Sequence, residues 1–498
     1  MSHDNMAFVD HPVPADENSP DRESKSSDDF SIRIKPMYHQ STPSYGNDDE
    51  SYREKSASPL AGVFTIQDDG KLDDQYEPHK HRNVSHPTTN LETLLHLMKG
   101  SLGTGILAMP KAFHHSGYAI GVVGTIVIGL ICTYCIHLLV KAQYELCKRR
   151  RVPSLSYPDT AVAAMEVGPR FFQKLAPFAA HVVNTFLLIY QLGTCCVYVV
   201  FVAENVKAVV DQYHNPIDIR LYMCCLLVPL ILLNWVRNLK FLAPFSTLAN
   251  MLTLVGFSIT LYYLFNDTFN PSDRRAVGHV QEFPLFFGTV LFALEAIGVI
   301  LPLENQMKKP RSFVGRYGVL NVAMVVIIFL YVGMGFLGYV RYGSHAQGSI
   351  TLDLPEEEIL AQSVKIMLAV AIFVTHGLQC YVAVDISWNH YLLPLVEKRR
   401  HILLMEYMVR TSLVLVTFLL AVAVPNLELF ISLFGALCLS ALGIAFPAII
   451  QTAVFWYHQD TKSFWIMVTK NSILVFFSLI GLVTGTYTSI MGLIEEFS

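Results

Sequence analysis

Eleven long apolar runs follow one another between residues 91 and 492, and they constrain the fold more than any other feature. Each run is long enough to cross about 30 Å of hydrocarbon as a helix. A membrane interior offers no partner to free backbone groups, so helices are expected, and the alternating segments of a membrane barrel are absent. The sequence therefore predicts an all-α polytopic membrane protein with eleven transmembrane helices. The predicted spans are 91–113, 117–140, 178–210, 220–236, 243–265, 283–303, 316–341, 361–384, 402–424, 427–450 and 465–492.

Charge divides the chain into two parts near residue 90. Residues 1–90 carry 9 Lys or Arg and 17 Asp or Glu, and they contain no long apolar stretch. Such a segment cannot bury enough apolar surface to offset its ordering entropy, so residues 1–90 are predicted to be a disordered, acidic cytoplasmic tail. Residues 91–498 are predicted to form the eleven-helix domain. Charged residues are only 15% of the chain, which excludes an ordinary soluble protein, and the acidic tail argues against nucleic acid as a partner.

The distribution of basic residues predicts the orientation in the membrane. With the N-terminus in the cytoplasm, the internal loops carry 17 Lys or Arg, whereas the external loops carry only Arg274 and Arg275. The membrane of residence stays open between the plasma membrane and a lysosomal or endosomal membrane. In this orientation Asn266, followed by Asp267 and Thr268, is an external sequon and a candidate glycosylation site.

The first span contains a cluster of small residues that a plain membrane helix would avoid. Glycines stand at positions 100, 103 and 105, with Ser101 and Thr104 between them. Glycine weakens a helix interior, and a break inside the bilayer must line a cavity, because lipid cannot satisfy the freed backbone groups. Close packing of helices through small residues is the alternative explanation.

The sixth span has a related interruption, with Glu295 near its middle and Ala296 and Gly298 beside it. An ionisable group at that depth is costly and marks a functional site. The two interruptions correspond if spans 1–5 and 6–10 form a 5+5 inverted repeat, as in secondary transporters of the LeuT type with broken helices 1 and 6. Freed N–H groups at such breaks hold a carboxylate, and unwound carbonyls accept an ammonium. The candidate substrate-binding residues are Gly100, Ser101, Gly103, Thr104, Gly105, Glu295, Ala296 and Gly298.

Two motifs resemble a known family. Residues 94–107, with Pro110, resemble the first helix of the proton-assisted amino acid transporters, which belong to the amino acid/auxin permease superfamily. Residues 288–307 resemble the sixth helix and following loop of that family, although Ala296 stands where the family usually has Gly. The resemblance covers about residues 85–495. It implies symport of small neutral amino acids, such as proline, alanine and glycine, with protons and without sodium.

Proton coupling has two candidates. His96 lies about one turn before the glycine cluster, and its imidazole suits a proton taken up outside and released into neutral cytosol. The resemblance implies the same role, while a helix–helix hydrogen bond is the alternative. Glu295 is the second candidate, with substrate binding, proton relay and pairing with Lys99 left open. Further pocket candidates, by depth and polarity, are Tyr190, Thr375 and His376.

The predicted function is secondary active transport of small neutral amino acids by proton symport with alternating access. A sodium-coupled amino acid transporter is the nearest alternative. A low-flux amino-acid sensor that signals to growth control is an alternative from another class. No enzyme is expected, because HExxH, nucleophile-elbow and P-loop motifs are absent, and no cofactor or metal is expected.

Overall fold

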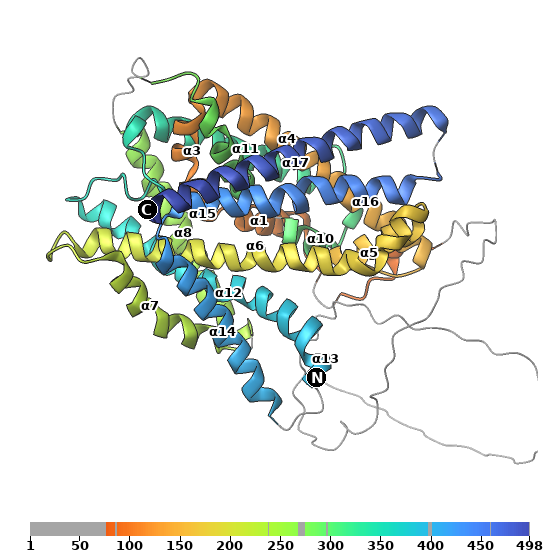
Figure 1. The fold of residues 1–498 in the computed structure, drawn as a ribbon, viewed down its shortest axis with the longest axis horizontal. Helices are drawn as coiled ribbons and strands as arrows, with labels where there is room; N and C mark the ends of the chain where they lie inside the picture. The colour runs from red at the N-terminus through yellow and green to blue at the C-terminus, as the bar shows by residue number, and fades with distance from the viewer. Residues whose placement is uncertain are drawn as a thin grey trace, which may run out of the picture. The chain divides into compact units, whose positions relative to one another are not determined.

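Helices make up nearly all of the described chain in this computed structural model (Figure 1). Within the described residues, β-pairing is limited to an isolated bridge between Thr88 and Met307. The structure describes residues 76–84, 87–237, 239–266, 274–294, 297–396, 401–458 and 460–497.

The first half of the described chain contains η1 (Pro78–Lys80), α1 (Asn90–Ser101), α2 (Thr104–Leu107), α3 (Met109–Ser116), α4 (Tyr118–Arg150), α5 (Tyr157–Val167), α6 (Arg170–Val210), α7 (Ile219–Asn234), α8 (Leu239–Phe265) and η3 (Val280–Glu282). The second half contains α9 (Phe283–Leu294), α10 (Ile297–Asn305), η4 (Pro310–Ser312), α11 (Val319–Tyr342), η5 (Gly343–His345), α12 (Ile359–Asp385), η6 (Ile386–Leu392), α13 (Leu393–Val396), α14 (Ile402–Ala423), α15 (Leu427–Phe434), η7 (Gly435–Ala445), α16 (Phe446–Phe455) and α17 (Thr461–Phe497). The segments η6 and η7 are π-helical insertions that join longer helices.

Each predicted span coincides with helical structure. Among the described residues, nine helical stretches are long and apolar enough to cross a membrane. Helix α7 is a shorter apolar helix, and the first predicted span is divided among α1, α2 and α3. The prediction of an all-α polytopic membrane protein is therefore confirmed.

Helix α5 lies in the connection between the second and third predicted spans, for which the sequence predicts no helix. Ser156 caps the helix by accepting a hydrogen bond from the Asp159 N–H at 3.2 Å. Tyr157 at its start donates to the carbonyl of Leu442 at 2.6 Å. The eleven residues of α5 are too few to span a bilayer, and a search for long apolar runs therefore misses them.

Residues 76–84, which we call the N-terminal strap, contact the helices although the sequence assigns them to the disordered tail. Both terminal nitrogens of Arg82 donate to the Glu304 carboxylate, each at 3.0 Å. Residue 88, further along, exchanges backbone hydrogen bonds at 2.9 Å with Gln306 and Lys308. The strap is held largely by ion pairs and hydrogen bonds, with Pro78 buried and the His79 ring stacked on Tyr144, so composition does not reveal it. The earlier part of the predicted tail lies outside the described residues.

The interior is organised around the divided first segment. Helix α6 lies beside α12 and also packs against α15, as Figure 1 shows. Helix α3 packs against α9 and α11, and α2 also contacts α9. The first and sixth predicted spans are thus direct neighbours, and α6 also contacts α2.

Candidate functional site

The first span leaves the helical conformation inside the predicted glycine cluster. Helix α1 ends at Ser101, Leu102 has φ −83° and ψ 76°, and Gly103 is extended. Helical structure resumes at Thr104. No side chain caps this new start, because its N-cap residue is Gly103. The first N–H groups of a helix lack intrahelical partners, so the interruption presents backbone donors to its surroundings.

Gly105 lets the backbones of α2 and α9 touch. A Cβ on this residue would lie 2.5 Å from the Cα of Ala293, closer than real Cβ atoms approach. Any larger side chain would therefore push the two segments apart. Gly298, in contrast, has no atom within 4 Å of such a Cβ among the described residues.

A small internal cavity of about 30 Å³ lies at the interruption. This volume has room for about two water molecules and is too small for an amino acid. An amino acid therefore needs a conformation in which this cavity is wider. Its lining residues are Gly100, Ser101, Gly103, Thr104, Gly105, Tyr190, Thr194, Tyr198, Phe292, Ala293 and Gln379. Six of the predicted candidates thus surround one space: the five small residues of the first span, and Tyr190.

Polar groups face this cavity from several helices. The Thr104 hydroxyl is buried and has no hydrogen-bond partner among the described residues. The Tyr198 hydroxyl of α6 hydrogen-bonds with Gln379 of α12 and would lie 3.8 Å from a Cβ at Gly103. Buried polar groups without partners are costly, so this arrangement suits a ligand that brings its own polar groups.

Tyr331 of α11 connects the first and sixth spans. Its side chain is fully buried, and its hydroxyl lies within hydrogen-bonding distance of the carbonyl of Ser101 and, at 2.6 Å, of Ala293. These carbonyls belong to the C-terminal ends of α1 and α9, where helix carbonyls lack intrahelical donors. The hydroxyl therefore fixes the two helix ends relative to each other.

Other predicted site residues lie elsewhere. Glu295 and Ala296 are outside the described residues, and Gly298 lies on an exposed face. His96 is also exposed, on α1, and is not among the residues that line the cavity. Lys99, considered as a partner of Glu295, donates to Ser246 at 3.1 Å.

Three more predicted positions are placed by local contacts away from the cavity. Thr375 donates to the carbonyl of Ala371 at 2.8 Å, within its own helix. His376 is buried next to Asn234 at 3.3 Å. The predicted glycosylation site Asn266 is exposed at the end of α8.

Sequence reasoning missed Thr194, Tyr198, Phe292, Gln379 and Tyr331. A usable signal existed on α6, where residues 190, 194 and 198 recur every fourth position and so share one helix face. Phe292 packs edge-on against Tyr190, with ring centres 6.1 Å apart. Gln379 and Tyr331 are polar residues in apolar helices. Only tertiary packing shows that Gln379 lines the cavity and that Tyr331 contacts the helix ends beside it.

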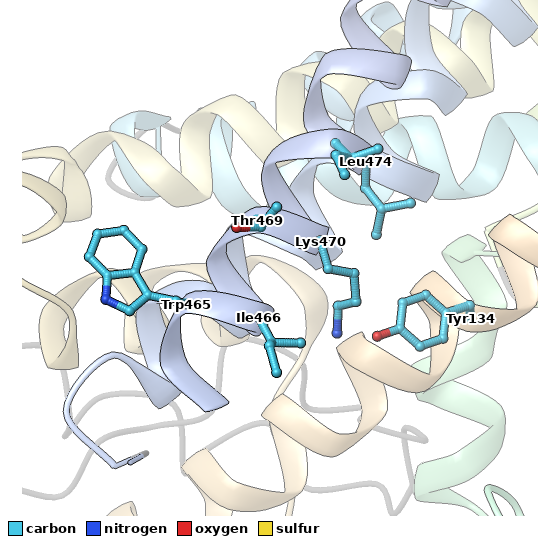
Figure 2. A pocket seen from close by; sticks show the side chains of 7 residues that line it. Tyr134, Trp465, Ile466, Thr469, Lys470 and Leu474 are labelled. Atoms are coloured by element: carbon cyan, nitrogen blue, oxygen red, sulfur yellow. The ribbon is translucent and has the colours of Figure 1, made fainter. Parts of the chain in front are cut away.

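A larger hollow of about 560 Å³ lies between α4 and α17 (Figure 2). Lys470 extends toward Tyr134 there, with its ammonium 4.8 Å from the ring centre. Trp465 and Ile466 on the same wall are each 61% exposed. An open, apolar hollow on an exposed helix face is typical of a lipid-facing surface, so we place the candidate site at the internal cavity.

The chain resembles known proteins in sequence over most of its length. The pattern of a family described as "Transmembrane amino acid transporter protein" matches residues 86–491. The chain is 42% identical over 425 residues to a Drosophila melanogaster protein, "Proton-coupled amino acid transporter-like protein pathetic", covering 85% of this chain and 89% of that one. It is 25% identical over 470 residues to "Probable amino acid transporter skat-1" of Caenorhabditis elegans, covering 90% and 99%.

Two solved structures also align with the chain. The inward-facing conformation of Mhp1 aligns at 11% identity with a TM-score of 0.44, covering 82% of this chain and 92% of that one. A closed conformation of Mhp1 with bromovinylhydantoin bound aligns at 12% identity with a TM-score of 0.45, covering 86% and 95%.

Proposed function

Because this chain belongs to the family of transmembrane amino acid transporters, we propose that it moves small neutral amino acids across a membrane together with protons, by alternating access. It is a multi-pass membrane transporter and not an enzyme. The proposal adds the size class of the substrate, the coupling ion and the binding site. Proline, alanine and glycine are the substrates to test first.

One observation carries the proposal: the interrupted first segment, α6, α9 and α12 together line one small polar cavity. The N–H groups that follow Gly103 suit a carboxylate, because they lie at the positive end of a helical segment. Carbonyls at the ends of α1 and α9 that Tyr331 does not occupy suit an ammonium. A zwitterion matches both, and the small volume favours a short side chain once the cavity opens.

Coupling to protons is supported by the similarity to the Drosophila relative, whose name describes that relative as proton-coupled. We propose His96 and Glu295 as the first candidates for this role, as the sequence predicts. Because the His96 side chain is exposed on α1, it would bind and release its proton at the surface of the helix rather than inside the cavity. Glu295 follows α9 in the sequence, outside the described residues, and it stays a candidate.

The same proposal includes the orientation of the chain. The N-terminus and the strap would face the cytoplasm, and the end that contains Asn266 would face the outside or a lumen. Either the plasma membrane or a lysosomal or endosomal membrane fits this orientation. Loss of a glycan-dependent mobility shift in Asn266→Gln, on a gel of protein from cells, tests the sidedness of that end.

The experiment that tests the function is uptake by the purified full-length chain in lipid vesicles. Labelled proline, alanine, glycine and leucine are offered with an inward proton gradient, from roughly pH 5.5 outside to 7.5 inside, and without it. Choline replaces sodium throughout. Gradient-dependent uptake and an inward current support the proposal. Uptake that does not depend on the proton gradient, or that requires sodium, overturns the proposal.

A further inference from the structure

A buried histidine joins three segments at the end of the fold opposite to the N-terminal strap. The Nδ1 atom of His115, in α3, lies 2.9 Å from Oε2 of Glu282 in η3. Its Nε2 atom makes a short contact with Oε1 of Glu428 in α15. We call these three residues the His115 cluster. The His115 side chain is only 8% exposed, whereas that of Glu282 is 36% exposed, so solvent reaches the cluster from the Glu282 side.

The geometry is that of a protonated imidazole. A neutral histidine carries one N–H, so one of its two ring nitrogens would face a carboxylate oxygen with a lone pair. Only the imidazolium donates from both nitrogens and satisfies both carboxylates at once. With both carboxylates ionised, the two contacts therefore exist together only when His115 holds a proton.

The charges around His115 favour protonation of its imidazole ring. Lys111 lies one turn earlier in α3, with its ammonium 3.5 Å from Glu428. Two carboxylates and one ammonium leave a single negative charge, which the proton on His115 cancels. His114 stands edge-on to His115, with ring centres 5.6 Å apart, and also meets Tyr339 of α11.

Helix α11 packs against α3 and carries Arg341 near this end, and Arg341 donates to the carbonyl of Tyr263. Helix α9 contains no ionisable side chain, and α4 has only Tyr118 near this end. In the loop before η3, Arg275 contacts His279 at 2.5 Å. Asp353 of the loop between α11 and α12 acts electrostatically on Lys111. The balance at His115 is thus set by Glu282, Glu428 and Lys111.

The position of the cluster links it to the cavity. Helix α3 follows α2 directly, and η3 runs into α9, so both segments continue into elements that line the cavity. Helix α15 packs against α9 and α6. A contact among α3, η3 and α15 therefore joins segments that lead directly into the lining of the cavity.

We propose that the His115 cluster is a proton-binding site at which proton uptake closes this end of the transporter over the cavity. The inference rests on the proposed function, because it assigns the place where a coupled proton enters. Loss of the proton leaves two carboxylates around a ring with a single donor, and the contact opens. Proton binding and closure are then one event, and the cluster adds to the earlier candidates His96 and Glu295.

The test measures amino-acid uptake by the full chain in vesicles as the outside solution is varied from roughly pH 5.5 to 7.5. His115→Gln keeps a similar size but cannot become a cation, so the ratio of uptake at the acid end to uptake at the neutral end falls to near one. His114→Gln is the matched control, since it removes the neighbouring ring and leaves both contacts of His115; it keeps the wild-type ratio.

A second variant decides the matter if His115→Gln does not fold. Glu428→Gln removes one carboxylate that favours the imidazolium, so the midpoint of the pH profile moves to a lower pH by about one unit. An unchanged profile in the variants that reach the membrane overturns the inference while the proposed function stands. A wild-type protein without any dependence on the proton gradient overturns the proposed function itself.

Discussion

The hydroxyl of Tyr331 lies 2.6 Å from the carbonyl oxygen of Ala293 and also contacts the carbonyl of Ser101. One side chain from α11 thereby holds the C-terminal ends of α1 and α9 together, beside the cavity. Both helix ends carry partial negative charge, and they would repel each other without a donor between them. Tyr331 is a positioning residue, since it acts through the two segments that line the site.

Tyr331→Phe tests that relationship. The ring still fills its buried space, but two buried carbonyls lose their shared donor, which costs about 1–3 kcal/mol of folding stability. We expect a lower melting temperature in detergent and a higher KM for the transported amino acid. Tyr317→Phe, at a residue that is 88% exposed, serves as the control. Wild-type melting and KM in Tyr331→Phe would contradict the assignment.

Gly105→Ala tests the close approach of α2 and α9. The added methyl group meets the Ala293 backbone at 2.5 Å, so the segments must separate, at a cost of about 1–3 kcal/mol. We expect uptake to fall at least tenfold. Gly298→Ala is the matched control, because its methyl group meets nothing within 4 Å among the described residues. Equal uptake by the two variants would show that the close approach of α2 to α9 is not required for transport.

Arg82→Ala tests the N-terminal strap. Glu304 is 2% exposed and would keep a buried charge without its bidentate partner, so a loss of about 3–5 kcal/mol is expected. Thermal melting of the purified variant measures this loss. Lys80→Ala, at an exposed position of the same strap, should melt like the wild type. If both variants melt alike, the strap does not stabilise the helical domain.

The environment of the Asp353 carboxyl predicts that the folding stability of the chain depends on pH. Burial raises the pKa of its carboxyl from 3.8 to about 7, against the smaller opposing effect of the Gln347 N–H groups. Between these two pH values the folded chain binds more protons than the unfolded chain, so stability falls as the pH rises. Asp353→Asn should flatten this decline, which amounts to at most about 4 kcal/mol.

The melting temperature measured from about pH 4 to 8 checks this expectation. Glu357→Gln, at an exposed position of the same loop, should leave the decline unchanged. An equally steep decline in Asp353→Asn would show that another group is responsible.

Much of the fold followed from the apolar runs alone. A chain in lipid must satisfy its backbone within each segment, so a long apolar run has one structural outcome, and all eleven runs coincide with helices. The glycine cluster located the interruption at Leu102 and Gly103, because glycine weakens a helix wherever it lies. The sequence did not predict helix α5 or the strap. Polar capping stabilises α5 and an ion pair holds the strap, and neither interaction shows in the pattern of apolar runs.

The sequence by itself therefore determined the membrane helices and the place where the first of them breaks, because hydrophobic length and backbone propensity are local properties. Tertiary structure alone decided which polar residues meet. Tyr331 reaches the interruption from α11, Gln379 reaches it from α12, and His115 finds carboxylates that lie 167 and 313 residues further along the chain. Hydrogen bonds act over only a few ångströms. A local sequence pattern does not show which distant segments come within that distance when the chain packs.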